Sequence, residues 1–379
     1  MHALYSSLVI IISFLTLSFC RVPVFNISLD VAPSERWNEV ATAFRPHAAL
    51  FTKRIYASLR YVLKTMNKTE RQVDIEVEVL DYWMEVIVLP SLPFEYREEI
   101  KGFAKRSNMD TRVVTMANLV FELSTYCTSL VAESKSGFLY HGRNLDYGFS
   151  VGLTKKALKK YIIVVNGHRK NKLIFSGASI FTVIGFSHAC GWNRVCVSVN
   201  QRKFDSSISL NLLSLLRKGM PMCMYLRQLV ESENIDFEAA VKRTATFKGI
   251  AAPGYITLSG VKTGDIAVVT RLRHKTLNVA RIDPKTQWYY VQTNHDPGHP
   301  RPKLDNWSVY RRKQAEKHLN ELGQNNLSFK NILKLMFQYP TNNNETVYVS
   351  VMSAKSPQTF LIYIPRDEHQ VWTKLRNLA

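Results

Sequence analysis

Two short runs of residues could together form a reactive centre. Tyr126–Ala132 reads YCTSLVA, and His141–Tyr147 reads HGRNLDY. The first run and the residues around the second are expected to be strands joined by a turn at 133–137, so the hairpin would bring Arg143 and Asp146 beside Cys127. A nearby cation favours thiolate over thiol, and a carboxylate can orient an amine or an arginine. The spacing therefore predicts a cysteine nucleophile at the start of a strand.

A structural interpretation of the same residues also stands. A single buried cysteine more often packs as a small apolar side chain than acts as a nucleophile. An Arg–Asp pair on a strand is usually only an ion pair. The residues alone therefore leave both interpretations open, and the structural one is the commoner outcome.

The elements before Tyr126 are expected to be helices. Apolar residues from Phe51 to Met66 recur at helical spacing and form one face, with basic residues off that stripe. Such a helix either packs on the core or rests on a membrane surface. Further helices are predicted over 94–104, after a break between two prolines, and over 110–125, where Asp110 would act as the N-cap.

After Tyr126 the pattern is rich in strands. Two are expected over 161–165 and 172–175, with the turn at Asn166-Gly167, the strongest short hairpin signal. Strands grouped into sheets, with helices on the outer faces, give a layered α+β architecture. The other predicted strands cover 255–258, 266–271, 288–293, 346–352 and 359–364, and the helices cover 210–218, 224–232, 237–246, 311–322 and 329–336.

The first 20 residues predict a cleaved signal peptide. They contain no Lys, Arg, Asp or Glu, and Leu8–Phe19 is an apolar run too short to span a bilayer. A secretory route to a lysosome or to the exterior is therefore expected. Five Asn-x-Ser/Thr sequons support it and predict a glycoprotein: Asn26, Asn67, Asn306, Asn326 and Asn344.

Cysteine content and charge narrow the partners. Cys190, Cys196 and Cys223 could offer one disulfide of undetermined pairing, and no His/Cys cluster has zinc-ligand spacing, so no metal and no cofactor are expected. Residues 21–126 are balanced in charge, so the net charge of +20 lies in residues 127–379. In a secreted protein such charge favours anionic lipid surfaces or glycans over nucleic acid, or it only maintains solubility.

The motif CTSLVA followed by HGRNLD resembles that of the lysosomal cysteine amidases of the acid ceramidase and N-acylethanolamine-hydrolysing acid amidase family. Supporting stretches run from about Phe25 to Ile364. The resemblance implies an α+β fold of the N-terminal-nucleophile hydrolase type, an αββα sandwich with a mainly helical α-subunit. It also implies a zymogen that cuts its own Tyr126–Cys127 bond in acid, leaving a heterodimer of residues 21–126 and 127–379.

The family's residue roles carry over to matching positions. Cys127 Sγ would attack the amide of a lipid, and its freed α-amine would pass protons between the thiol and the leaving group. Arg143 and Asp146 would support this pair, and Asn294 would donate an N–H to the developing oxyanion. The resemblance places Asn200, Arg202 and Arg311 on the substrate side.

Some positions depart from the family's pattern. His295 stands where a tyrosine is common, Gln201 replaces a glutamate, and the loop that ends at Arg311 is longer and contains the Asn306 sequon. These changes surround the leaving-group and entrance region. They bear on the identity of the substrate more than on the nucleophile.

Three functions follow as hypotheses. The first is an active amidase for an N-acylethanolamine-like lipid, the second is the same chemistry on ceramide or another N-acyl conjugate, and the third is a catalytically weak lipid-binding relative. Each needs a place for an acyl chain. An apolar channel is expected where the two subunits meet, lined from residues 44–66 and 180–186.

Overall fold

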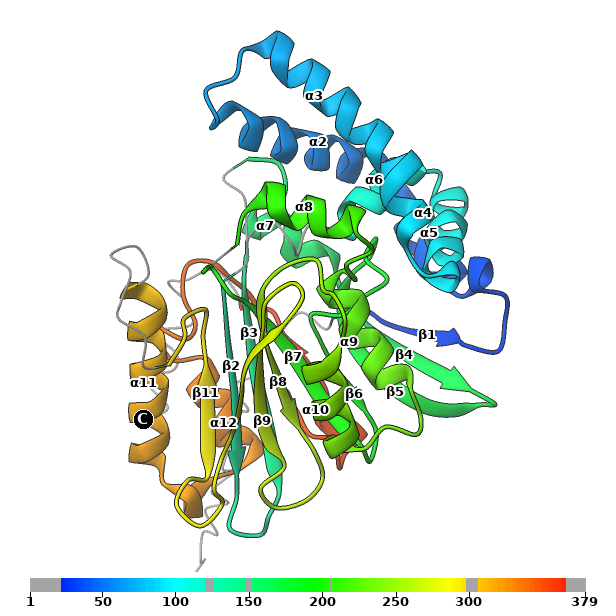
Figure 1. The fold of residues 1–379 in the computed structure, drawn as a ribbon. Helices are drawn as coiled ribbons and strands as arrows, with labels where there is room; N and C mark the ends of the chain where they lie inside the picture. Colours follow the sequence, from blue (N-terminus) through cyan, green and yellow to red (C-terminus); the bar gives the residue numbers. More distant parts are fainter. Residues whose placement is uncertain (1–21, 120–125, 148–150, 205, 298–305, 366–379) are drawn as a thin grey trace, which may run out of the picture.

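Two β-sheets form the centre of the molecule (Figure 1). The structure, a computed structural model, describes residues 22–119, 126–147, 151–204, 206–297 and 306–365. The larger sheet has the strand order β1 (Val24–Ser28), β4 (Ile162–Arg169), β5 (Lys172–Ile180), β6 (His188–Gly191), β7 (Val195–Gln201), β8 (Gly254–Ser259), β9 (Ile266–Arg271) and β10 (Thr276–Arg281). The smaller sheet has the order β11 (Tyr289–Gln292), β2 (Tyr126–Glu133), β3 (Leu139–Asp146), β12 (Thr346–Met352) and β13 (Leu361–Tyr363).

Helices cover both outer faces of the paired sheets. α9 (Met222–Glu231) and α10 (Phe237–Thr246) pack on the larger sheet, whereas α11 (Asn306–Leu322) and α12 (Phe329–Met336) pack on the smaller one. The sheets meet each other where β2 contacts β7 and β8. The fold is thus the predicted αββα sandwich of N-terminal-nucleophile hydrolases, and α8 (Ile208–Leu216) and the short α7 (Lys155–Leu158) lie at one end of it.

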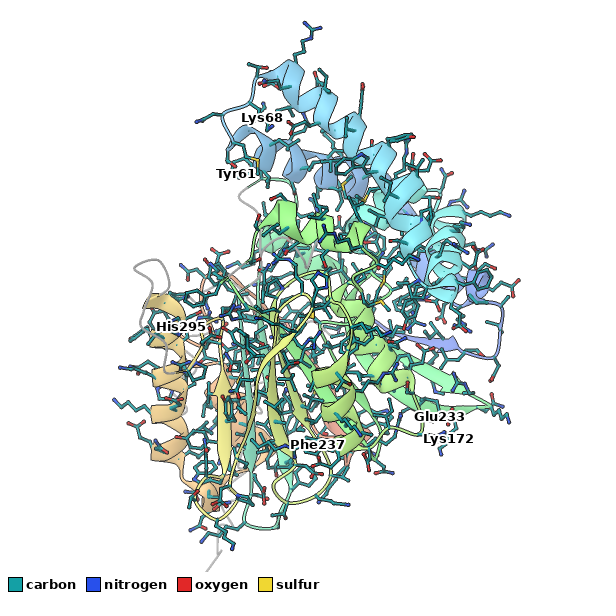
Figure 2. All side chains as sticks on the ribbon, viewed as in Figure 1. Tyr61, Lys68, Lys172, Glu233, Phe237 and His295 are labelled. Carbon is teal, nitrogen blue, oxygen red and sulfur yellow. A yellow bond between two sulfur atoms is a disulfide. The ribbon has the colours of Figure 1, made fainter. Side chains whose placement is uncertain are left out.

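The first third of the chain is mainly helical, as predicted. Its helices are α1 (Asn38–Phe44), α2 (Ala48–Lys64), α3 (Glu70–Trp83), the short α4 (Leu89–Ser91), α5 (Phe94–Ser107) and α6 (Thr111–Ala117). Asp110 caps α6 as expected. The helix predicted over 110–125 ends at Ala117, and residues 120–125 lie outside the described residues. α3 was not predicted, and it starts with a capping box between Thr69 and Gln72. Figure 2 shows Tyr61 and Lys68 near the tip of the α2–α3 hairpin.

One strand of the first third belongs to the larger sheet. β1 pairs in parallel with β4, with Val24 opposite Val164 and Ser28 opposite His168. A purely helical interpretation of this segment is therefore wrong at its start. Because parallel partners need a long connection, a five-residue strand of this kind has no local turn signal in the sequence.

The predicted turn at Asn166-Gly167 is also wrong. Both residues lie inside β4, where Asn166 pairs with Ser176 and Gly167 with Phe175. The hairpin turns instead at Lys170 and Asn171, both with positive φ (48° and 59°). A Cβ on residue 167 would lie 2.2 Å from the Phe175 ring, so the glycine makes room for that ring.

An aromatic cluster joins the first third to the rest of the chain. The Phe181 ring lies 4.5 Å from that of Phe44 and 4.8 Å from that of Phe51, centroid to centroid. Tyr161 closes the cluster at 5.3 Å from Phe181. These rings belong to the hydrophobic core, so this part of the expected acyl channel is filled.

A buried ion pair crosses the same junction. Arg227 on α9 donates through both Nη atoms to Glu99 on α5, with 2.8 Å between Nη2 and Oε1. Trp37 Nε1 donates to the same carboxylate at 2.7 Å, and Arg36 Nη1 donates at 3.1 Å. Both side chains of the Glu99–Arg227 pair are fully buried. Removing one partner would leave the other charge buried without its main counter-ion.

Two of the described cysteines form a disulfide. Cys190 and Cys196 are directly opposite on β6 and β7, and of the other described cysteines Cys127 and Cys223 are buried thiols.

The four sequon asparagines whose side chains are described, Asn26, Asn67, Asn326 and Asn344, are all exposed, as a glycan would require. Among the described residues, no helix is both long and apolar enough to cross a bilayer.

Candidate active site

The predicted nucleophile, Cys127, and the predicted cation, Arg143, lie side by side on neighbouring strands. β2 pairs with β3 so that Cys127 is opposite Leu145 and Ser129 opposite Arg143. Alternate side chains of both strands face the larger sheet, and Arg143 Nη2 donates to Cys127 Sγ at 2.9 Å. Both side chains are fully buried. A guanidinium at this distance favours the thiolate, as the hairpin spacing predicted.

Asn200 holds the Arg143 guanidinium in place. Its Oδ1 accepts from Arg143 Nη1 at 2.5 Å and from Ser129 Oγ at 2.7 Å. Its Nδ2 donates to the Cys127 carbonyl oxygen at 3.2 Å and to the Gln292 carbonyl oxygen at 2.9 Å. Asn200 was predicted on the substrate side. Its contacts here are with the Cys127 carbonyl oxygen and with the Arg143 guanidinium.

Asn294 contacts the backbone nitrogen that a cut before Cys127 would turn into an amine. Its Oδ1 accepts the Cys127 N–H at 2.8 Å and also accepts from Arg311 Nη2 at 2.9 Å. Its Nδ2 donates to the Gln201 carbonyl oxygen at 2.8 Å. Asn294 thus holds the Cys127 nitrogen through Oδ1 and the Gln201 carbonyl oxygen through Nδ2.

Asp146 lies on the other face of the smaller sheet from the thiol. It pairs with Tyr126 in the register, so its side chain points towards α11 together with that of Thr128. Its Oδ2 is 3.2 Å from Arg311 Nη1, which also donates to the Cys127 carbonyl oxygen at 2.9 Å. Burial raises the pKa of the Asp146 carboxyl, and Arg311 opposes that shift. Asp146 thus reaches the nucleophile through Arg311.

Arg202, the remaining predicted residue, forms a buried ion pair next to this cluster. Arg202 binds Asp296 through two nitrogens, with 2.6 Å between Nη2 and Oδ2, and Tyr255 Oη donates to the same carboxylate at 2.8 Å. Sequence reasoning had not given Asp296 this role. His295, labelled in Figure 2 beside α11, is buried, and its ring meets Phe204 edge-on with 5.6 Å between centroids.

A layer of buried polar side chains continues from the nucleophile between the two sheets. His141 lies between Ser259 Oγ (3.0 Å from Nδ1) and Ser198 Oγ (2.8 Å from Nε2), and Ser198 Oγ is 2.9 Å from Ser129 Oγ. Burial, reinforced by the nearby Arg143 charge, lowers the pKa of His141 to about 3. The same causes lower the pKa of His188, which lies between Tyr348 and Ser350.

The neutral state of His141 makes stability depend on pH. Because the folded chain resists protonation while the unfolded chain takes up a proton near pH 6.5, this contribution is present above pH 6.5 and is lost as the pH falls towards 3. At a pH two units below the usual histidine pKa of 6.5, the loss of unfolding free energy is about 2.7 kcal/mol. We expect His141→Gln to flatten the fall in the free energy of unfolding between pH 7 and 4.5 by about that amount.

Urea unfolding at both pH values would measure this effect, on a Cys127→Ala background so that the chain stays whole. His274→Gln, at an exposed position, is the matched control and should leave the pH dependence unchanged. Parallel curves for His141→Gln and the parent chain would show that His141 is not the group responsible.

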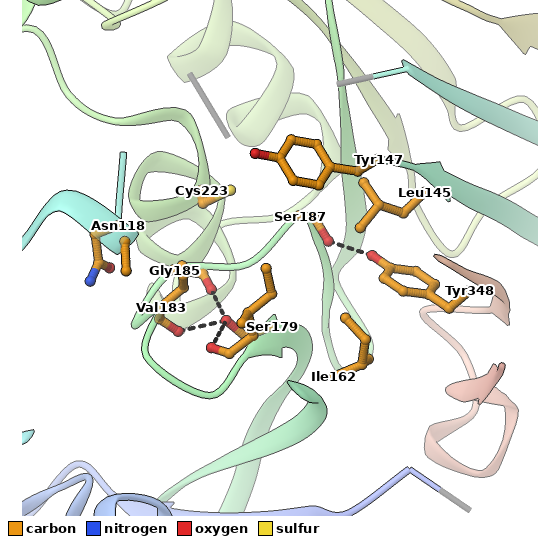
Figure 3. A pocket seen from close by; sticks show the side chains of 12 residues that line it. Asn118, Leu145, Tyr147, Ile162, Ser179, Val183, Gly185, Ser187, Cys223 and Tyr348 are labelled. Carbon is orange, nitrogen blue, oxygen red and sulfur yellow. Dashed lines mark hydrogen bonds between the residues drawn. The ribbon is translucent and has the colours of Figure 1, made fainter. Parts of the chain in front are cut away.

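Two apolar cavities lie between the first third of the chain and the rest. A small one, of about 40 Å³, is lined by Leu145, the cross-strand neighbour of Cys127 on β3, and by Tyr348, which is opposite Leu145 on β12 (Figure 3). A larger one, of about 600 Å³, lies among α2, α3 and α8, where Leu59, Val62 and Met66 form part of its wall. The expected channel residues are therefore divided: Ile180 and Val183 line the small cavity, and the end of α2 lines the large one.

Comparisons with known proteins agree with this architecture. The family model described as the beta subunit of N-acylethanolamine-hydrolyzing acid amidase matches residues 21–66. An N-acylethanolamine-hydrolyzing acid amidase of Cavia porcellus is 31% identical over 358 residues, which cover 94% of this chain and 91% of that protein. An acid ceramidase of Mus musculus is 30% identical over 348 residues, covering 89% and 85% of the two chains.

A solved structure extends the likeness to three dimensions. The Caenorhabditis elegans N-acylethanolamine-hydrolyzing acid amidase ortholog superposes with a TM-score of 0.55 at 27% identity, over 63% of this chain and 100% of that one. Sequence likeness over almost the whole chain and the shared fold lead to one conclusion: the chain belongs to the acid ceramidase and N-acylethanolamine-hydrolyzing acid amidase family of amide hydrolases.

Proposed function

We propose that this chain cuts its own Tyr126–Cys127 bond in acid and then hydrolyses the amide of an N-acylethanolamine-like lipid to a fatty acid and an amine. The observation that carries the proposal is the 2.9 Å contact between Arg143 Nη2 and Cys127 Sγ, combined with the hold of Asn294 on the Cys127 nitrogen. One group activates the nucleophile and the other fixes the atom that becomes its α-amine.

Burial of the nucleophile supports the self-cleavage step. In the uncut chain Cys127 has no exposed surface, and Tyr126 before it belongs to the same strand. The Tyr126 ring lies under Lys203 Nζ, 3.3 Å from its centroid, and within 6.0 Å of the Arg311 guanidinium carbon. A lipid amide bound at Cys127 Sγ would need the space that Tyr126 occupies. The uncut chain is therefore proposed to be inactive on external substrates.

The proposed chemistry uses the same atoms twice. In self-cleavage, Cys127 Sγ attacks the Tyr126 carbonyl carbon, the C–N bond breaks as a thioester forms, and water releases the Tyr126 carboxylate. In turnover, Sγ attacks the lipid amide, the amine departs with a proton from the Cys127 α-ammonium, and water hydrolyses the acyl-thioester. An α-amine titrates near pH 7.7 to 8.0, so it is charged in acid and can give that proton.

The proposal includes the rest of the precursor. Residues 1–20 direct the chain into the secretory pathway and to a lysosome or the exterior, and residues 21–126 and 127–379 become the two subunits. The apolar cavities provide a place for the acyl chain near α2. The exposed side chains of Tyr61, Met66 and Ile75, together with the net charge of +20 carried by residues 127–379, suit contact with an anionic membrane that supplies the lipid.

The experiment is N-terminal sequencing of the purified protein after incubation at neutral and at acidic pH, together with Cys127→Ala. A new chain that begins Cys-Thr-Ser, appears in acid and is absent from the variant is the expected result. Turnover of an N-acylethanolamine and a ceramide with the same acyl chain then separates the two substrate classes. A folded wild-type chain that stays intact at both pH values would refute self-cleavage and favour the lipid-binding relative.

A further inference from the structure

The run Thr341-Asn-Asn-Asn-Glu-Thr346 leads from the loop after α12 to the first residue of β12, and Asn344 and Thr346 in it belong to one sequon. Thr346 is 1% exposed although Asn344 beside it is exposed. The Thr346 hydroxyl donates to Asp146 Oδ1 at 2.7 Å, and Asn343 Nδ2 donates to Asp146 Oδ2 at 3.0 Å. The same threonine Oγ1 accepts the Asn343 N–H at 2.9 Å. The two residues thus brace each other against one carboxylate.

These contacts lead to the nucleophile. Asp146 binds Arg311 Nη1, and the guanidinium of Arg311 donates to the Cys127 carbonyl oxygen and to Asn294 Oδ1. Every residue in this series of contacts is buried or half-buried. A hydrogen bond to an ionised group is stronger than a neutral one, so the two donors favour the charged, correctly turned carboxylate.

We infer that Thr346 and Asn343 are positioning residues, which hold Asp146 and, through Arg311, set the geometry of Cys127 and Asn294. This inference rests on the proposed function. It gives the threonine of the Asn344 sequon a role in the folded protein that does not depend on a glycan. Loss of activity in a sequon variant at Thr346 would therefore not be evidence that the glycan matters.

The experiment separates hydroxyl from glycan. Asn344→Gln removes the sequon and keeps Thr346, whereas Thr346→Ser keeps both the sequon and a hydroxyl. Thr346→Val placed in the Asn344→Gln protein removes only the hydroxyl relative to its parent. Asn343→Ala tests the second donor without altering the sequon. Self-cleavage rate, lipid hydrolysis and their pH profiles are measured for all four, with thermal unfolding as a check on folding.

We expect Asn344→Gln and Thr346→Ser to keep wild-type rates, and the valine variant and Asn343→Ala to lose about ten-fold or more. The groups that contact Asp146 are Arg311, Thr346 and Asn343, and the charge of Arg143, on the other face of the sheet, also lowers its pKa. Removing a donor that favours the ionised form should also move the acidic limb of the pH–rate profile to higher pH. A merely structural defect would lower the rate equally at every pH.

The outcomes distinguish the two proposals. Active wild-type protein, with folded valine and Asn343→Ala variants that keep its rate and its acidic limb, would overturn the inference alone. If the valine variant does not fold, a folded Asn343→Ala protein with the wild-type rate and acidic limb is enough to overturn it. Wild-type protein that neither cuts itself nor hydrolyses lipid amides would overturn the proposed function, and the inference with it.

Discussion

Replacing Arg143 by methionine is expected to lower kcat/KM for lipid hydrolysis by about 10- to 1,000-fold in acid. The guanidinium donates to Cys127 Sγ at 2.9 Å. An opposite charge at such a distance lowers the pKa of an acidic group by about one to three units. Removing that charge therefore lowers the fraction of thiolate in acid by about 10- to 1,000-fold. Methionine fills much of the volume but offers no donor to Sγ or to Asn200 Oδ1.

The pH dependence of Cys127 alkylation by iodoacetamide, followed on its own peptide by mass spectrometry, measures the thiolate directly. Arg143→Lys is the matched variant, because it keeps the charge but loses the fork that joins Cys127 to Asn200; an intermediate loss is expected. If Arg143→Met folds and its thiol reacts with the same pH dependence as the wild type, the arginine does not activate the nucleophile.

Glu99→Leu is expected to lower the free energy of unfolding of the uncut chain by about 3 to 5 kcal/mol. The substitution leaves Arg227 fully buried, with only the contact of its Nε to Glu231 at 3.2 Å as an ion pair. Urea unfolding of Glu99→Leu in the Cys127→Ala chain measures the loss. The pair joins the two segments that self-cleavage would separate, so the cut protein should be at least as sensitive.

Two variants control for this effect. Glu238→Gln breaks an ion pair with Arg281 whose side chains are 64% and 43% exposed, and it should cost less than about 1 kcal/mol. The double variant Glu99→Leu/Arg227→Met removes both buried charges and should recover most of the loss. If Glu99→Leu lowers the free energy of unfolding no more than Glu238→Gln does, Glu99 does not hold the two segments together.

The centre of the site could be predicted because its key residues are local in sequence. The hairpin of β2 and β3 was expected from alternation and a short turn, and it alone sets the relation between Cys127 and Arg143. Phe237–Thr246 and Thr346–Met352 also begin and end as predicted, because polar caps and β-branched runs mark their limits.

The parts that could not be predicted depend on distant pairing. Arg311 was expected at the substrate, and its contact with the Cys127 carbonyl oxygen was not expected, because only the packing of α11 on the smaller sheet determines which way its side chain points. Thr346 was expected only as the start of a strand and as part of a sequon, since nothing in Asn-Glu-Thr reveals a carboxylate 200 residues away in the chain. The pairing of Cys190 with Cys196 likewise required the register of β6 and β7.

The placement of β1 has a consequence for expression of the two segments and for refolding of the protein. A fragment that starts at Cys127 would have an unpaired β4 edge and a buried Arg227 without Glu99, so separate expression of the two pieces should give aggregates. Refolding of the whole chain is an event within one molecule, whereas refolding after a cut requires two pieces to meet. Heat damage should therefore be reversible before the cut and permanent after it, and the lifetime of the mature protein would depend on how slowly it unfolds.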